Sequence, residues 1–168
     1  MAVIADREIK VADEVWIATA LLHRENPSQP DFSVEEIVAR ARKESPAESL
    51  RPGVYLHAQM HCVANRPPNP GRYRMLIETS RGRRRLFRPG DRYDPRREGS
   101  KTVPLPEDLP EKYRPLLDWY AEWSRSLAKE ASPKSRFDVL LALRGSGREL
   151  WANEHADEYV RRLRESWQ

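Results

Sequence analysis

The chain has 168 residues, of which 33% are charged, and its net charge is +4. Its single cysteine, Cys62, excludes an intramolecular disulfide, and the segment Met1 to Lys10 lacks the apolar stretch of a signal peptide. No run of the roughly 20 apolar residues that cross a bilayer is present. We therefore expect a cytoplasmic protein without a membrane partner.

The positive charge is concentrated in one segment. Residues 1–65 carry a balance of −3 and residues 102–168 a balance of −1, whereas residues 66–101 hold twelve basic and four acidic residues, a balance of +8. A local positive field of this kind favours an anionic partner at one face of the molecule.

The first elements along the chain are predicted to be three short helices. Apolar spacing predicts a helix over 9–25. Ser33 and Glu36 have the spacing of a capping box, which predicts a second helix that ends near Glu44. A third helix is expected to begin at Pro52 and to run to about Asn65.

A β-hairpin is predicted after the helices, within residues 71–88, with a turn at Ser80-Arg81-Gly82. The order of three helices and a hairpin predicts a mainly α protein with a small β-hairpin, a winged helix-turn-helix at residues 1–90. Residues 91–106 are rich in proline, glycine and charge, which predicts a basic linker. A helical region over 107–131 and a tail over 137–168, used for partner binding or dimerisation, complete the expected organisation.

The third helix would be the recognition helix of such a fold, and its polar side chains are candidate contacts to bases or phosphates. The alternative is that some of them face solvent or fill the core. The candidate residues are Tyr55, His57, Gln59, His61, Asn65 and Arg66.

The hairpin would be the wing, and its arginines are candidate contacts to phosphates or to the minor groove of double-stranded DNA. A solvated hairpin, an RNA site or a surface for an acidic protein remain alternatives. The candidate residues are Arg72, Arg74, Arg81, Arg83, Arg84, Arg85 and Arg88.

No catalytic, metal or cofactor site is expected. His57, His61 and Cys62 are close in sequence, but Ala58 stands where a zinc protease has glutamate. The carboxylates of residues 91–98 lie beside Lys101, as in some nucleases, yet a segment rich in proline and glycine is a poor rigid frame for metal chemistry. We expect a protein that is not an enzyme.

The tail, Leu141 to Trp167, resembles the C-terminal segment of bacterial antitoxins of the VapB and prevent-host-death type, most closely over residues 143–151. That resemblance implies a PIN-domain ribonuclease toxin as partner, with an arginine entering its acidic pocket. The residues that would bind the partner are Leu143, Arg144, Arg148, Leu150 and Trp151. The front of the chain departs from the usual small DNA-binding folds of those antitoxins.

Residues 9–123 resemble an uncharacterised bacterial winged-helix family, through residues 12–16, 61–65, 71–76 and 84–91. Together these features predict a DNA-binding transcription regulator, in its most concrete version an antitoxin that represses its own operon. A homodimer is compatible with that role. The alternative is a DNA-binding accessory module of a restriction or defence system.

Overall fold

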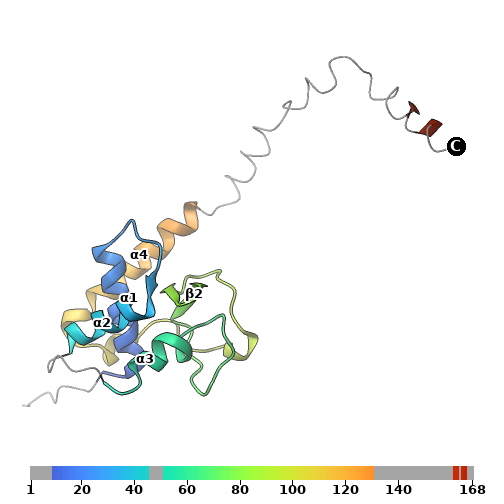
Figure 1. The fold of residues 1–168 in the computed structure, drawn as a ribbon. Helices are drawn as coiled ribbons and strands as arrows, with labels where there is room; N and C mark the ends of the chain where they lie inside the picture. Colours follow the sequence, from blue (N-terminus) through green and yellow to red (C-terminus); the bar gives the residue numbers. More distant parts are fainter. Residues whose placement is uncertain (1–8, 46–50, 131–160, 163, 166–168) are drawn as a thin grey trace, which may run out of the picture. The chain divides into compact units, whose positions relative to one another are not determined.

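The structure is a computed structural model, and it describes residues 9–45, 51–130, 161–162 and 164–165. The longer helices are α1 (Val11–Glu25), α2 (Val34–Glu44) and α4 (Pro115–Glu130) (Figure 1). The three strands are β1 (Phe32–Ser33), β2 (Leu76–Ser80) and β3 (Arg83–Leu86). The expectation of a mainly α protein with a small sheet is therefore confirmed.

Shorter elements complete the fold: helix α3 (Val54–Leu56), the π-helix η1 (His57–His61) and the 3₁₀ turns η2 (Pro95–Arg97), η3 (Pro106–Asp108) and η4 (Glu111–Tyr113). The chain divides into two compact units, residues 1–124 and 125–168. In the second unit, residues 161–162 and 164–165 are helical and exposed.

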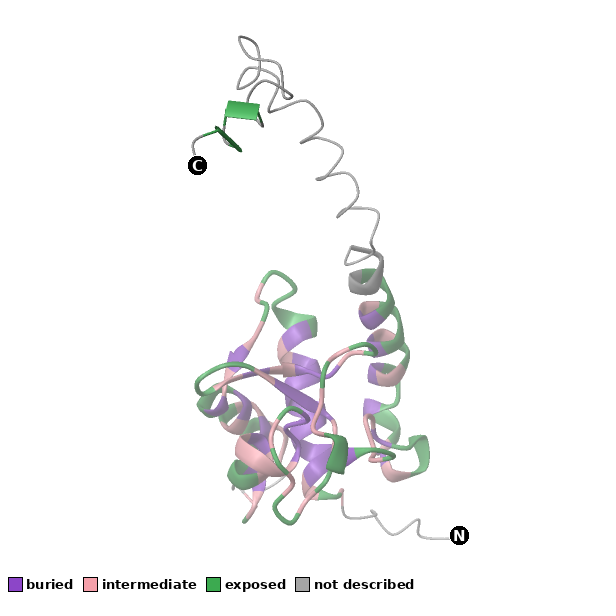
Figure 2. Ribbon diagram, turned by 90° about the vertical axis from the view of Figure 1, so that its right-hand side faces the viewer, coloured by how far each residue is buried: buried purple, intermediate pink, exposed green. Residues whose placement is uncertain are grey.

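Helix α1 forms the centre of the core of the first unit, because Trp16, Ile17 and Ala18 on successive positions are all buried (Figure 2). Helix α2 begins at the expected capping box. Ser33 Oγ accepts from the Glu36 amide at 3.1 Å, and the Glu36 carboxylate accepts from the Ser33 amide at 2.7 Å. Two amides of the first helical turn thus gain partners that the helix itself lacks.

The third helix is shorter than expected. Gly53, at φ +94°, precedes it, and η1 ends at His61 instead of near Asn65. The chain leaves the helix because it joins the sheet: the Ala64 amide donates to the Leu76 carbonyl at 2.7 Å, and the Leu76 amide donates to the Cys62 carbonyl at 2.9 Å.

The sheet is antiparallel and has the order β1-β3-β2. The predicted hairpin is present, with Leu76 paired to Leu86 and a turn at Arg81-Gly82. Gly82 has φ +77°, a conformation that glycine adopts without strain. Strand β1 was not predicted, because a strand of two residues carries no periodicity to detect.

Residues 91–106, expected to form a linker, belong instead to the first compact unit. Arg97 is fully buried there, and Lys101 Nζ lies 2.8 Å from Asp13 Oδ1 on α1. The start of α4 belongs to the same core, because Tyr120 packs edge-on against Trp16 with ring centroids 5.7 Å apart. Within the described residues, no helix is long and apolar enough to cross a membrane.

Candidate nucleic-acid interface

The basic segment at residues 66–101 is mostly folded into the protein. Arg84 illustrates this, because its side chain is only 1% exposed. Its guanidinium donates to Glu78 at 3.0 Å and to the backbone carbonyls of Arg83 and Gln59 at 2.9 and 3.1 Å. Arg84 was expected on the DNA-binding surface, and in the structure it is a core residue that ties β3 to η1.

Strand alternation is the signal that could have found this placement. Side chains two apart on a strand point to the same face. Leu86 is an obvious core residue, and Arg84 shares its face, so both are buried on β3. Arg83 and Arg85 point the other way and are partly exposed.

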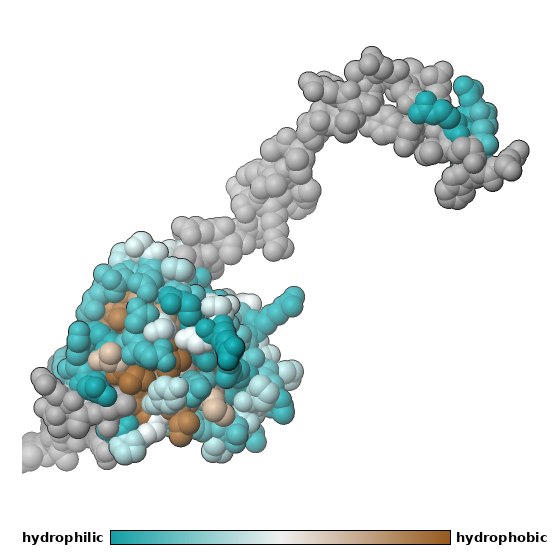
Figure 3. Space-filling model, viewed as in Figure 1, coloured by the Kyte–Doolittle hydropathy of each residue, from teal (hydrophilic) through white to brown (hydrophobic). Residues whose placement is uncertain are grey.

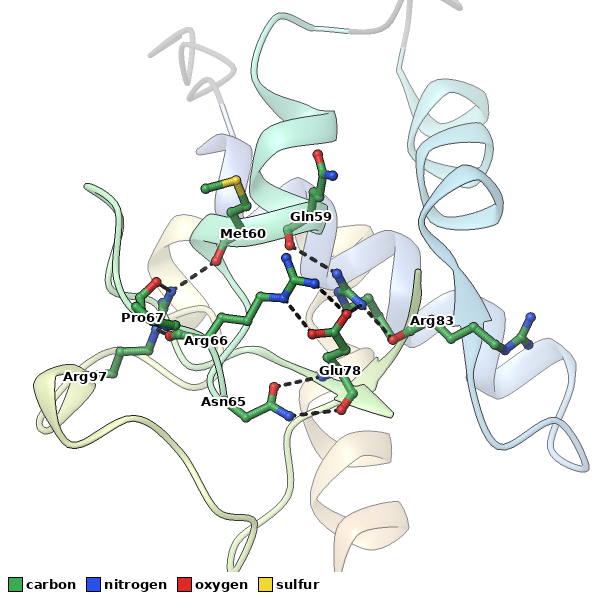
Figure 4. A network of polar contacts seen from close by, with 9 residues as sticks. Gln59, Met60, Asn65, Arg66, Pro67, Glu78, Arg83 and Arg97 are labelled. Carbon is green, nitrogen blue, oxygen red and sulfur yellow. Dashed lines mark hydrogen bonds and ion pairs between the residues drawn. The ribbon is translucent and has the colours of Figure 1, made fainter. Parts of the chain in front are cut away.

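Glu78 on β2 holds two arginines at once (Figure 4). Arg66 donates to both carboxylate oxygens through Nε and Nη2, each at 2.6 Å. The buried Arg84 donates to the same carboxylate at 3.0 Å. The Arg66 hydrogen bond is the largest effect that lowers the pKa of Glu78. Asn65 fixes the backbone of Glu78 as well, donating to its carbonyl at 2.9 Å and accepting from its amide at 3.0 Å.

Arg97 is a second buried arginine, and its hydrogen-bond acceptors are all main-chain carbonyls. Nε donates to Arg66 at 2.7 Å, and Nη1 donates to His61 and Tyr73 at 2.8 and 2.7 Å. Nη2 donates to Met60 and Pro67 at 3.0 and 3.3 Å. These five bonds use the full donor capacity of a guanidinium. They fix the end of η1 to the loop that leads into the hairpin.

Two wing arginines are paired with carboxylates at the surface. Arg83 Nε lies 2.5 Å from Asp31 Oδ1, and Arg85 donates to both oxygens of Asp91 at 2.7 Å. A hydrogen bond from Thr79 at 2.6 Å is the largest effect that lowers the pKa of Asp31. Each carboxylate is thus the counter-ion of the arginine beside it.

Two further wing arginines lie over aromatic rings. The Arg74 guanidinium carbon is 4.3 Å from the ring centroid of Tyr93, and that of Arg88 is 4.5 Å from the centroid of Trp123. Cation–π contacts of this kind hold the planar group flat against the protein. Arg74 and Arg88 are therefore engaged within the domain.

Three arginines of the segment remain exposed, with no hydrogen bond or ion pair to any residue that the structure describes: Arg72, Arg81 and Arg92. Arg81 occupies the tip of the hairpin. Arg72 lines an open hollow of about 300 Å³ together with Gly71, Tyr73, Ser100 and Lys101. These three guanidinium groups can donate hydrogen bonds to phosphate without giving up a hydrogen bond or ion pair to a described residue.

The helix expected to read bases exposes apolar surface. Tyr55 is 45% exposed and Leu56 is 49% exposed. Figure 3 shows a face of the first unit on which hydrophilic residues surround a group of hydrophobic ones. His57 Nδ1 lies 3.0 Å from the Gly53 carbonyl, and His61 Nδ1 accepts from the Gly71 amide at 3.1 Å. Burial is the main cause that lowers the pKa of His61, with charge from His57 and Arg97 adding to it.

The structural residues that sequence reasoning missed are Asp31, Glu78 and Arg97. Asp31 and Arg97 bond residues that are far away in the sequence, so no spacing marks them. Glu78 stands opposite Arg84 in the β2–β3 register, a pairing that the predicted hairpin could have indicated. Cys62 is buried, and burial raises the pKa of its thiol. Within the described ranges, no three His, Cys, Asp or Glu side chains gather as metal ligands.

The predicted partner-binding residues of the tail, at positions 143, 144, 148, 150 and 151, lie outside the described residues. No family model, curated protein or solved structure matches the chain. Its function must therefore be inferred from its own geometry.

Proposed function

We propose that this chain binds double-stranded DNA through a winged helix-turn-helix domain within residues 1–90. The topology carries the proposal. Helix α1, strand β1, helix α2, the α3–η1 helix and the β2–β3 hairpin follow one another, and β1 pairs with β3 in the sheet order β1-β3-β2. That succession is the winged-helix order, in which the third helix and the hairpin face the nucleic acid.

The placement of charge supports the same proposal. Arg81 projects from the hairpin turn, where a wing contacts phosphates or the minor groove. Arg72 and Arg92 add two further guanidinium groups without partners among the described residues. The turn arginine of the wing has no partner among the described residues, while Arg83, Arg84 and Arg85 are paired with carboxylates. This arrangement suits contact with a polyanion at a few points.

Two roles are compatible with DNA binding. One is the regulator, with the antitoxin that represses its own operon and binds a PIN-domain toxin as its specific version. The other is an accessory module that attaches a partner to DNA. The second is favoured by the small number of arginines in residues 66–101 that have no partner among the described residues, because phosphate contacts carry no sequence information and a few of them bind weakly.

Fluorescence anisotropy of the full chain with a labelled 20-base-pair duplex, at about 50 mM salt, tests the proposal. We expect saturable binding in the micromolar range, which is typical of contacts to the DNA backbone. Arg81→Glu should weaken it, while Arg24→Glu, a charge reversal on the exposed end of α1, should not. Absence of binding at low salt would contradict the proposal.

A further inference from the structure

Sequence-specific DNA binding requires side chains that are free to form paired hydrogen bonds to base edges. Arginine does this with guanine, and asparagine or glutamine with adenine. In this chain, the groups of that chemistry near the third helix are Gln59, Asn65 and Arg66, beside the two histidines of η1.

Asn65 and Arg66 are already used in the paired way that a base would require. The Asn65 amide bonds both the amide and the carbonyl of Glu78, at 3.0 and 2.9 Å. Arg66 makes two bonds of 2.6 Å to the Glu78 carboxylate. Reading a base would require each to give up two good hydrogen bonds at once, so neither is available as a reader.

The two histidines are each half engaged. His57 Nδ1 faces the Gly53 carbonyl and His61 Nδ1 holds the Gly71 amide, while the two rings pack with centroids 4.8 Å apart. The contact at Gly71 is tight, because a Cβ there would lie 2.7 Å from the Cβ of His61. The rings are thus fixed, and one remaining nitrogen on each cannot form a paired contact.

Gln59 is the one remaining side chain of the three. The main-chain carbonyl of Gln59 accepts a hydrogen bond from Arg84 at 3.1 Å. Its side chain points away from the polar network in Figure 4. Its neighbours on the exposed side of the helix are Tyr55 and Leu56, which offer no paired hydrogen bonds. One amide can make at most one paired contact, to adenine, so Gln59 alone supplies little selection over a whole site.

The unengaged groups are arginines, which bind phosphate as well as guanine, and none of them lies on the third helix. Arg72, Arg81 and Arg92 are exposed guanidiniums, with no hydrogen bond or ion pair in the described part of the chain. We infer that the winged-helix surface binds the sugar-phosphate backbone of duplex DNA without selecting a base sequence, an inference that rests on the proposed function. This favours the accessory role over repression of one operator.

Selection from a duplex library with a randomised 20-base-pair centre tests the inference, because it requires no guess about a site. The full chain would be used to capture duplexes over several rounds, and the bound pool would be sequenced. We expect no enriched motif, and we expect single duplexes drawn from the first and last pools to bind within about threefold of each other. Specific regulators separate such duplexes by about a thousandfold or more.

Matched variants sharpen the outcome. Gln59→Ala should leave affinity for every duplex unchanged within about twofold, whereas Arg81→Glu should lower affinity for all duplexes by a similar factor. An enriched motif bound more than a hundredfold above random duplex, with Gln59→Ala relaxing that preference, would overturn the inference while the proposed DNA binding stands. Failure to capture any duplex at low salt would overturn both.

Discussion

Arg81 and Arg84 lie three residues apart on one hairpin, yet they belong to different parts of the molecule. Arg81 is exposed at the turn, and Arg84 is 1% exposed and bonded to Glu78 and to two carbonyls. Arg97 and Arg72 differ in the same way, because Arg97 is fully buried among carbonyls and Arg72 is exposed. A dense run of arginines is therefore not the same as a binding surface, because most of these side chains stabilise the domain that presents the others.

The largest loss of stability is expected for a substitution at Arg97. Arg97→Met removes the donors to the five main-chain carbonyls around its fully buried side chain; the Met60 carbonyl keeps the Val63 amide, and the other four lose this donor. Each buried acceptor left without a partner costs about 1–3 kcal/mol, so we expect the free energy of unfolding to fall by at least about 4 kcal/mol. Urea denaturation measures this.

The neighbouring Arg96→Met is the control for that measurement, because Arg96 is exposed and its one ion pair among the described residues is with Asp94. We expect its unfolding transition to coincide with that of the unchanged chain. Equal transitions for the two variants would mean that Arg97 is not a structural residue.

The second-largest loss of stability is expected for Arg84→Met. The variant leaves Glu78 with one arginine instead of two and removes the link between β3 and the Gln59 carbonyl. Breaking a buried ion pair costs about 3–5 kcal/mol, and the Arg66 bonds that remain place this case at about 3 kcal/mol. Thermal unfolding should show a clear loss for Arg84→Met and none for Arg81→Met; a reversed order would contradict the division between buried and exposed arginines.

His23 makes the stability of the fold depend on pH. It is buried beside Arg85 and Arg88, and burial, followed by these two charges, lowers its pKa to about 4. The folded state therefore binds fewer protons than the unfolded state, whose histidine titrates near 6.5, so stability is complete above about pH 6.5 and is lost as the pH falls toward 4. We expect a loss of about 2 kcal/mol between pH 7 and pH 5 from this group.

His23→Gln isolates that effect, because glutamine can still accept from the Leu86 amide but does not titrate. Urea titrations of both chains at pH 7, 6 and 5 should show a steeper loss for the unchanged chain. Parallel losses in the two chains would assign the pH dependence to other groups.

The smallest free-energy change is expected at the exposed arginines, where function is affected in place of stability. Arg81→Glu should weaken duplex binding about tenfold, equivalent to about 1.4 kcal/mol, with an unchanged melting temperature. Anisotropy and thermal unfolding on the same preparation check both parts. A lower melting temperature with unchanged affinity would show that Arg81 stabilises the domain and does not contact DNA.

Local signals predicted the frame of the fold. Ser33 and Glu36 marked the start of α2, and Gly82 marked the hairpin turn, because a capping box and a tight turn are set by residues adjacent in sequence. Strand β1 escaped prediction because Phe32 and Ser33 are held by partners on β3, about fifty residues away.

The candidate interface was less predictable. Arg97 resembled a linker residue because its composition context is rich in proline and glycine, while its acceptors are carbonyls 24 to 37 residues distant. The sequence shows the net charge of +8 in residues 66–101. Three counter-ions of this segment, Asp13, Asp31 and Asp108, lie outside it. Only folding brings these charges together.

The salt dependence of duplex binding tests the central claim most directly. Each phosphate neutralised contributes about −0.9 to the slope of log Kobs against log salt concentration. Arg72, Arg81 and Arg92 are the cations of residues 66–101 that have no hydrogen bond or ion pair in the described part of the chain. Titrations between about 50 and 200 mM should therefore give a slope no steeper than about −3. A slope of about −7 or steeper would show that the arginines now bonded to carboxylates and carbonyls bind phosphate instead, and would contradict the account.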